Sequence, residues 1–567
     1  MNARVALDHK LLENLKIGTN ITYTYKDQNT RRDPLNMCNK IVPLSKPYDE
    51  NGEVVKRIRE YKKMVWSNTL SYLTTFNNIH HLDFLAGYEI DDTYNDYLSG
   101  EAYNFTTPDK HAISNGMKTV SVGGSDSRYR LVSYLSRLNY DYKNKYYLGA
   151  SFRVDGSSRL HRDNRWGTFW SVSGAWRTIE EEFMQPVKDW LTDLRIRASY
   201  GVNGTLPSDY FGYMGLSSIS GGYLEQPGIQ MSQIANPNLK WETNYNMNIG
   251  LDFGFWDRLN FTIEYYTRTT KNLLMDCPVS MTTGFSSYLM NIGEVKNKGI
   301  ELTINSTNIK IKDFSWNTTF NLGHNSNKVV KLDGEQTQIV SGTQIHKVGS
   351  SYRTFYVQEF AGINPETGNP LFYTNELDEN GNYIKEITEN SKNAQFIPYK
   401  HAEPTVNGGI SNSLRYKWLD LNFLFSYQFG GYSYDTWAQK TEHGGYDSYA
   451  NIPTYYRDSW KKPGDQTNIE VYMPGKSSSV SMHKITSSRR IHSTDYFRLK
   501  NITFGITLPK EWTNKINIGN VRFYASASNL WTWAAYDNYD PEAVSAGSAT
   551  QTTPPLKTVT FGLNINF

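Results

Sequence analysis

The chain has few cysteines, little net charge and no long hydrophobic run. Cys38 and Cys277 are the only cysteines among 567 residues, and they fit no metal-ligand spacing. The formal charge of +3 argues against a nucleic-acid-binding surface, which requires clustered lysines and arginines. No stretch approaches the roughly 18–20 apolar residues of a transmembrane helix, so a helical membrane protein is excluded. A membrane β-barrel remains open, because only every second residue of its strands must be apolar.

The beginning of the chain lacks a basic region followed by an apolar run. Residues 1–10 read M-N-A-R-V-A-L-D-H-K, so we expect this chain to carry no signal peptide. Aromatic residues are abundant, at 14% of the sequence. Aromatic girdles at the two faces of a bilayer would use many of them, although sugar-binding surfaces or the cores of large β-sandwiches could also do so.

The last residues form a strand with two different faces. The odd positions from Val559 to Phe567 are apolar, and the even positions from Thr558 to Asn566 are small and polar. Side chains alternate between the faces of a strand, so this segment would separate an apolar from a polar environment. A wall between lipid and a watery lumen fits the pattern, and so does the last strand of a soluble sandwich.

Repetition of this pattern favours the membrane wall. The same alternation recurs in residues 145–155, 244–253, 259–266, 418–429 and 521–528. In these segments Arg, Glu and Asp occupy only the polar side. That distribution is expected when the other side meets hydrocarbon, where a basic residue at mid-depth costs roughly 2–4 kcal/mol.

The connections between strand candidates alternate between short and long. Residues 3–10 and 14–28 predict a hairpin. Alternating segments bounded by turn residues predict about 18 wall strands in all, with residues 113–121 and 129–142 as two separate strands. The long polar connections span residues 204–239, 272–296, 326–404, 431–493 and 534–555. We assign the strand candidate 353–363 to the connection 326–404. The sequence therefore predicts an all-β fold, a large antiparallel transmembrane β-barrel with brief turns at one end and extended loops at the other.

One long loop, 431–493, contains aromatic residues whose rings, if exposed, are candidates for ligand binding. Those candidates are Tyr434, Trp437, Tyr446, Tyr449 and Tyr455. Aromatic rings spaced among glycine, aspartate and serine can stack on sugars or contact a peptide or lid protein. The alternative is that they pack the loop against itself or belong to a girdle.

A second loop offers a weak calcium hypothesis, and catalytic motifs are missing. Asp378, Asn380, Asn382 and Glu389 have the spacing of a calcium-binding loop, but Tyr383 stands where that loop needs glycine. A plain turn is the other interpretation. The string P-G-K-S at 474–477 lacks the upstream glycine of a phosphate-binding loop. We therefore predict no catalytic residues, no enzyme activity and no other cofactor.

Several strings resemble SusC/RagA-type TonB-dependent transporters across essentially the whole chain. They are N-Y-D-Y-K-N-K-Y-Y-L-G-A-S-F-R-V-D-G-S-S-R-L (139–160), N-R-W-G-T-F-W-S-V-S-G-A-W-R (164–177), N-P-N-L-K-W-E-T-N-Y-N (236–246), N-I-G-E-V-K-N-K-G-I-E-L (291–302), D-Y-F-R-L-K-N-I-T-F-G (495–505) and N-L-W-T-W-A-A-Y-D-N-Y-D-P-E (529–542).

The resemblance implies an importer in the outer membrane of a member of the Bacteroidetes. Family members close a barrel of about 22 strands around a plug. A SusD-like surface lipoprotein caps them, the TonB–ExbB–ExbD complex powers them, and their cargo is oligosaccharide or peptide. The plug and first strands have no counterpart here, so residues 1–567 would be the C-terminal barrel portion. We expect that this polypeptide alone does not close a transporting barrel, since unpaired strand edges in lipid are costly.

Other classes of protein remain open. A passive porin or a surface adhesin needs neither a plug nor energy coupling. A secreted carbohydrate-binding β-protein or glycosidase would be soluble without detergent.

Overall fold

The computed structural model describes residues 1–32, 53–105, 112–223, 226–332, 337–445, 452–473, 485–513, 515, 518–549 and 554–566. Two compact units share these residues. The first comprises residues 1–176, 198–247 and 269–294, and the second comprises 177–197, 248–268 and 295–567. Among the described residues, no helix is both long and apolar enough to cross a membrane.

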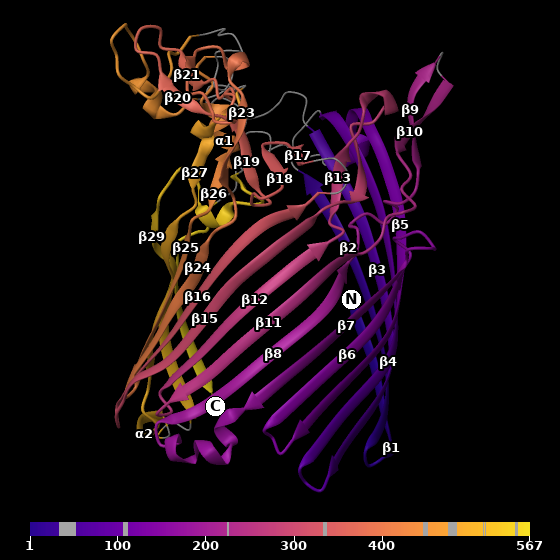
Figure 1. Cartoon of the computed structure of the whole chain (residues 1–567), viewed down its shortest axis with the longest axis vertical. Coiled ribbons are helices and arrows are strands. Elements are labelled where there is room, and N and C mark those ends of the chain that lie inside the picture. Colours follow the sequence, from indigo (N-terminus) through magenta and orange to yellow (C-terminus); the bar gives the residue numbers. More distant parts are fainter. Residues whose placement is uncertain are drawn as a thin grey trace. The chain divides into compact units, whose positions relative to one another are not determined.

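The first unit is built mainly on long antiparallel strands. Its strands are β1 (Asn2–Leu12), β2 (Leu15–Arg32), β3 (Glu53–Phe76), β4 (His80–Phe105), β5 (Gly116–Tyr142), β6 (Tyr146–Ser157), β7 (Trp166–Arg177), β9 (Leu216–Tyr223), β10 (Gln226–Gln233), β13 (Leu274–Pro278) and β14 (Ser287–Asn291). From β1 to β7 each strand pairs antiparallel with the next, and Figure 1 shows them side by side. Asn77 and Asn78 turn β3 into β4 with φ values of 51° and 59°, a conformation that asparagine tolerates well.

The second unit contains a further series of wall strands. Strands β8 (Leu191–Thr205), β11 (Glu242–Phe255) and β12 (Leu259–Lys271) contribute residues to both units, and β15 (Glu294–Lys310), β16 (Phe314–Lys331), β24 (Val406–Tyr416), β25 (Leu419–Phe429), β28 (Tyr496–Thr507), β29 (Asn520–Ala534) and β31 (Thr558–Asn566) follow. β16, β24, β25, β28, β29 and β31 pair antiparallel in that order.

Short elements of the second unit gather at one end of its wall strands (Figure 1). They are β17 (Gln338–Ser341), β18 (Gln344–Lys347), β19 (Thr354–Gln358), β20 (Phe360–Ile363), β21 (Pro370–Tyr373), β22 (Ile387–Thr388), β23 (Phe396–His401), β26 (Tyr432–Asp435), α1 (Thr436–Thr441), β27 (Ile491–Ser493) and β30 (Ser548–Ala549). The helix α2 (Lys510–Thr513) lies at the opposite end. Single 3-10 turns occupy Ile113–Asn115, Thr178–Glu180, Glu182–Val187, Met281–Thr283, Ser391–Asn393, Thr454–Asp458, Ser488–Arg490 and Pro541–Ala543.

The apolar rows of the wall strands are exposed. On β31, Phe561 is 80% exposed and Val559 is 58% exposed, and on β6 Leu148 is 62% exposed. Rows of exposed apolar side chains such as these are rare on soluble monomers, because burial of each side chain away from water is favourable by about 1.5–3 kcal/mol. These rows are therefore surfaces for lipid and not the core of a globule.

Charged residues on the opposite face neutralise one another, between neighbouring strands or within one strand. In the second unit, Arg522 on β29 donates through Nη2 to Asp420 Oδ2 on β25 at 2.6 Å. In the first unit, Arg153 on β6 donates through Nε to Asp155 Oδ1 at 2.7 Å. The sequence assigned all of these residues to the polar side of their strands, and the structure confirms this.

The structure confirms most predicted strands and corrects one pair. The hairpin of residues 3–10 and 14–28 corresponds to β1 and β2. Residues 354–363 form β19 and β20, which belong to small sheets outside the wall, as expected. The predicted strands 113–121 and 129–142 are one strand, β5, because its exposed glycine and serine residues still pair with β4. The main sheet of the described residues consequently has 17 strands, against about 18 predicted.

Candidate functional site

The loop segment after β26 presents Trp437 on a short, capped helix. Asp435 Oδ1 accepts hydrogen bonds from the backbone N–H groups of Trp437 at 3.0 Å and Ala438 at 2.8 Å. This cap satisfies two amides that the first turn of a helix leaves unpaired. The other oxygen of Asp435 accepts a bond from the Tyr536 hydroxyl at 3.0 Å. The Trp437 side chain remains 39% exposed.

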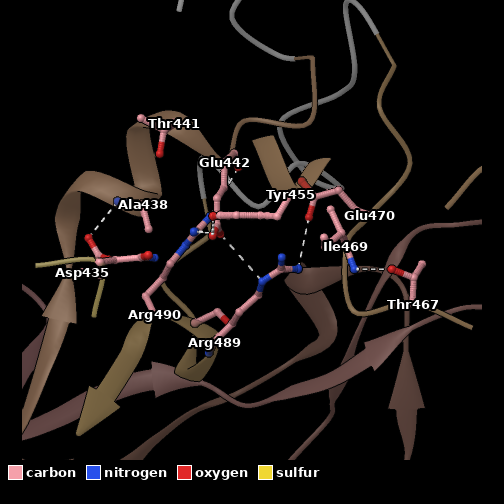
Figure 2. A network of polar contacts seen from close by, with 12 residues as sticks. Asp435, Ala438, Thr441, Glu442, Tyr455, Thr467, Ile469, Glu470, Arg489 and Arg490 are labelled. Carbon is pink, nitrogen blue, oxygen red and sulfur yellow. Dashed lines mark hydrogen bonds and ion pairs between the residues drawn. The ribbon is translucent and has the colours of Figure 1, made fainter. Parts of the chain in front are cut away.

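A buried polar network connects the end of α1 with two 3-10 turns, Thr454–Asp458 and Ser488–Arg490, the second of which directly precedes β27 (Figure 2). Arg490 has no exposed surface, and its guanidinium contacts the Glu442 carboxylate. The Tyr455 hydroxyl donates to the same carboxylate. Arg489 Nη1 lies 3.5 Å from Glu470 Oε2. A buried charge is costly without a partner, so these contacts tie segments distant in the sequence into one body.

Aromatic rings form a layer next to this network. The rings of His492 and Tyr536 stack with centroids 3.7 Å apart and an interplanar angle of 3°. The hydroxyls of Ser433 and Tyr539 hydrogen-bond to each other. Burial lowers the pKa of His492 to about 4 and raises the pKa of Tyr539 to about 12. Both side chains are therefore neutral at physiological pH.

A pocket of about 670 Å³ opens beside Trp437 on this body. Its walls are Asp435, Trp437, Arg498, Asn529, Thr532, Trp533, Ala534, Asp537, Asn538, Tyr539, Asp540, Pro541, Ala549, Pro554, Pro555 and Lys557. Arg498, at the loop end of β28, is buried and donates through Nη2 to Asp540 Oδ2 at 2.6 Å, and it also contacts Glu542. The pocket thus combines indole rings with carboxylate, amide and hydroxyl groups, as binding sites for polar organic ligands do.

The predicted loop aromatics have different environments. Trp437 lines the pocket. Tyr434 is only 1% exposed and packs with Phe355, Val357 and Ile491, so for this residue the structure favours the alternative that it packs the loop. Tyr455 is half-buried and donates its hydroxyl to Glu442, while burial raises its pKa to about 12. Tyr446 and Tyr449 lie outside the described residues.

The residues of the calcium hypothesis form two separate turns. Asp378 Oδ1 accepts the backbone N–H groups of Asn380 and Asn382 at 2.9 and 2.8 Å. Glu389 instead accepts side-chain hydrogen bonds from Asn364, Thr367 and Asn369. Within the described ranges no group of His, Cys, Asp or Glu side chains has the arrangement of a metal site. These contacts favour the plain turn.

Sequence reasoning missed the pocket walls contributed by Arg498 and residues 529–541. A signal for them existed, because both segments occur in the strings that carry the family resemblance. The pairing of Arg498 with Asp540 and Glu542 gives a physical reason for the strings D-Y-F-R-L-K and Y-D-P-E to occur together.

Long antiparallel strands with an exposed apolar face and a paired polar face define an outer-membrane β-barrel chain. The chain belongs to the TonB-dependent receptor-like β-barrel family, whose model matches residues 2–383. This finding confirms the predicted fold class and the outer-membrane location, and the family consists of transporters and not enzymes.

The relatives of this chain include a SusC protein and the solved RagAB structure. TonB-dependent receptor P3 of Formosa agariphila is 32% identical over 547 residues, covering 91% of this chain and 53% of that protein. TonB-dependent receptor SusC of Bacteroides thetaiotaomicron is 29% identical over 544 residues, covering 92% of this chain and 51% of that protein. The solved structure of the RagAB peptide transporter aligns with a TM-score of 0.85 and 26% identity, over all of this chain and 61% of that one. The chain spans about half the length of the curated relatives it matches.

Proposed function

We propose that this chain is the barrel portion of an energy-coupled importer of oligosaccharides or peptides. The observation that carries the proposal is the alignment of the entire chain with the RagAB peptide transporter at a TM-score of 0.85. In the proposed protein, residues 1–567 supply the passage and the outer loops. A SusD-like surface lipoprotein closes over the loops and traps the cargo.

The polar face of the second unit supports a passage for polar cargo. Between Lys500 and Arg522, the residues of β28 and β29 on this face are uncharged, including Asn501, Thr503 and Ser526. Arg498 and Arg522 each pair with carboxylates. Hydroxyl and amide groups replace water around a polar solute without fixing it by charge, which suits a surface that a ligand must also leave.

Energy coupling is the property that separates import from passive diffusion. We propose that the TonB–ExbB–ExbD complex acts on a plug that belongs to the protein outside residues 1–567. This assignment rests on the length of the relatives, which is about twice the part that this chain matches.

Uptake by intact cells tests the proposal. Cells that produce the complete protein and its lid lipoprotein are incubated with fluorescently labelled oligosaccharides and peptides, in strains with and without TonB. Uptake of a labelled oligomer that disappears without TonB supports the import function. Equal uptake in both strains would indicate a passive porin, and recovery of the protein in the soluble fraction without detergent would indicate a secreted β-protein.

A further inference from the structure

The pocket beside Trp437 has walls from segments that the buried network holds in place. Asp435 and Trp437 come from β26 and α1, Arg498 from β28, and Asn529 to Pro541 from β29 and the segment after it. Parallel pairing of β26 with β30 and the stack of His492 on Tyr536 join these segments. A pocket on such a body is already formed before a ligand arrives, so binding requires little ordering of the protein.

The charges that line the pocket are mostly neutralised by the protein itself. Arg498 is paired with Asp540 and Glu542, and Lys500 Nζ lies 2.6 Å from Glu542 Oε2. Asp435 accepts two helix amides and the Tyr536 hydroxyl. What remains is one carboxylate, Asp537, and one ammonium, Lys557. Neither has an ion pair or a side-chain hydrogen bond within the described part of the chain. The pocket therefore presents no excess of positive or negative charge to a ligand.

One buried polar atom without a partner nevertheless points to a ligand. Asn529 Oδ1 is buried and accepts no hydrogen bond, although Asn529 Nδ2 donates to Leu556 O at 3.2 Å. Asn529 has a φ of 54° next to the irregularity in the β28–β29 ladder, so its side chain is held in a position that ordinary strand geometry does not give. Buried acceptors are satisfied in nearly all proteins, and a hydroxyl donor in the pocket would satisfy this one.

We propose that this pocket is a subsite for a neutral saccharide unit of the imported oligomer, with Trp437 as the stacking residue and Asp537 and Asn529 as hydrogen-bond acceptors. This inference rests on the proposed import function. An exposed indole provides a flat apolar face for the C–H side of a sugar ring, at low entropic cost. Carboxylate and amide oxygens accept from the sugar hydroxyls, and Lys557 donates to them.

The wall strands at the pocket differ in their free edges. An extended peptide is commonly recognised by pairing with the free edge of a sheet. β28 pairs with β25 and β29 around Arg498, so it offers no free edge, whereas among the described residues the end of β29 beyond Ser528 pairs with β28 alone. A peptide that pairs with this end of β29 is therefore the competing occupant, and the heptapeptide probes test it. The uncharged face of β28 and β29 that leads away from the pocket favours the saccharide, because hydroxyl and amide groups solvate a chain of hydroxyl groups.

Binding by the complete protein, purified in detergent, tests the inference. The probes are an array of neutral and acidic oligosaccharides and a library of random heptapeptides. We expect binding to neutral oligosaccharides, at least tenfold weaker binding by Trp437→Ala, and a smaller loss for Trp437→Phe, which keeps an aromatic face. Asp537→Asn should weaken binding severalfold. The matched control is Trp512→Ala on α2, an indole that is 61% exposed at the other end of the wall strands, and it should bind as the unmodified protein does.

Binding of heptapeptides without any oligosaccharide overturns the inference, as does binding of neither class. Oligosaccharide binding that is unchanged in Trp437→Ala overturns it as well. Uptake measured in parallel, with and without TonB, distinguishes failure of the subsite proposal from failure of the import proposal. Uptake that persists unchanged in the Trp437→Ala variant refutes the subsite while import stands, whereas uptake by the unmodified protein that does not need TonB refutes import itself.

Discussion

Replacing Arg490 by methionine should lower the local stability of α1 and of the 3-10 turn Ser488–Arg490 without unfolding the wall strands. Arg490 is completely buried, and its guanidinium contacts the largely buried Glu442. Removing one partner of a buried ion pair costs about 3–5 kcal/mol, because the other charge stays behind without compensation. Glu442 keeps the Tyr455 hydroxyl and has Arg489 Nε at 3.8 Å, so we expect the lower end of that range.

Hydrogen exchange of the amides in residues 436–443 and 488–493 measures this effect. A loss of about 3 kcal/mol in local stability corresponds to exchange faster by about two orders of magnitude. The variant Glu442→Gln/Arg490→Met removes both charges, keeps an acceptor for Tyr455, and should recover most of the protection. Lys462→Met, an exposed lysine of the same loop, should change nothing. Unchanged exchange in Arg490→Met, or a double variant no better than the single one, would refute the reasoning.

Further predictions concern the wall strands, the stacked ring of His492, and the ion pairs of Arg498 beside the pocket. Phe561→Arg on the exposed apolar row of β31 should cost about 2–4 kcal/mol in denaturant unfolding from lipid vesicles, and Thr560→Arg on the polar face much less; equal losses would speak against a lipid-facing row. His492 has a folded pKa of about 4, below its ordinary value of 6.5. The opened loop therefore binds a proton first, and local stability should fall as the pH drops from about 6.5 to 4. The charges facing His492 are Asp435, Arg489 and Arg490, and His492→Phe should flatten this dependence in hydrogen exchange; a slope that persists in that variant would assign it to other groups. Arg498→Met should leave the Asp540 carboxylate without a cation, while Glu542 keeps Lys500, and should increase proteolysis of residues 536–549; an unchanged cleavage pattern would contradict the role assigned to the ion pair.

The alternation of apolar and polar residues predicted the wall strands, because the geometry of a strand places every second side chain on the same face. Successive side chains of a strand point to opposite faces, and only one face can contact lipid. The alternation in residues 418–429 and 556–567 therefore indicates which side chains face lipid. The merged strand β5 escaped prediction, because Gly123 and Gly124 interrupt the pattern while the neighbouring strand β4 still supplies hydrogen-bond partners. Tertiary pairing overrode a local turn signal there.

The candidate site was only partly predictable for a different reason. Trp437 was identified from the composition of its own loop, since an exposed ring among small polar residues is a local feature. Arg498, Asn529 and Asp537 reach the same pocket from other segments, and no local pattern states that they meet. Tyr434 lies in a polar loop, yet its ring is buried against Phe355 from another loop, a contact that the composition of its own loop does not reveal.

Spin labels along β31 test most directly whether the apolar rows of the wall face lipid. Single cysteines are placed from Val559 to Ile565 in the complete protein, with Cys38 and Cys277 replaced by alanine, and the protein is reconstituted into lipid vesicles. If the odd positions face lipid, labels there collide with dissolved oxygen and labels at the even positions collide with a water-soluble nickel reagent, in strict alternation along the strand. Accessibility to the nickel reagent at odd and even positions alike, or to neither reagent at the odd ones, would contradict a lipid-facing row.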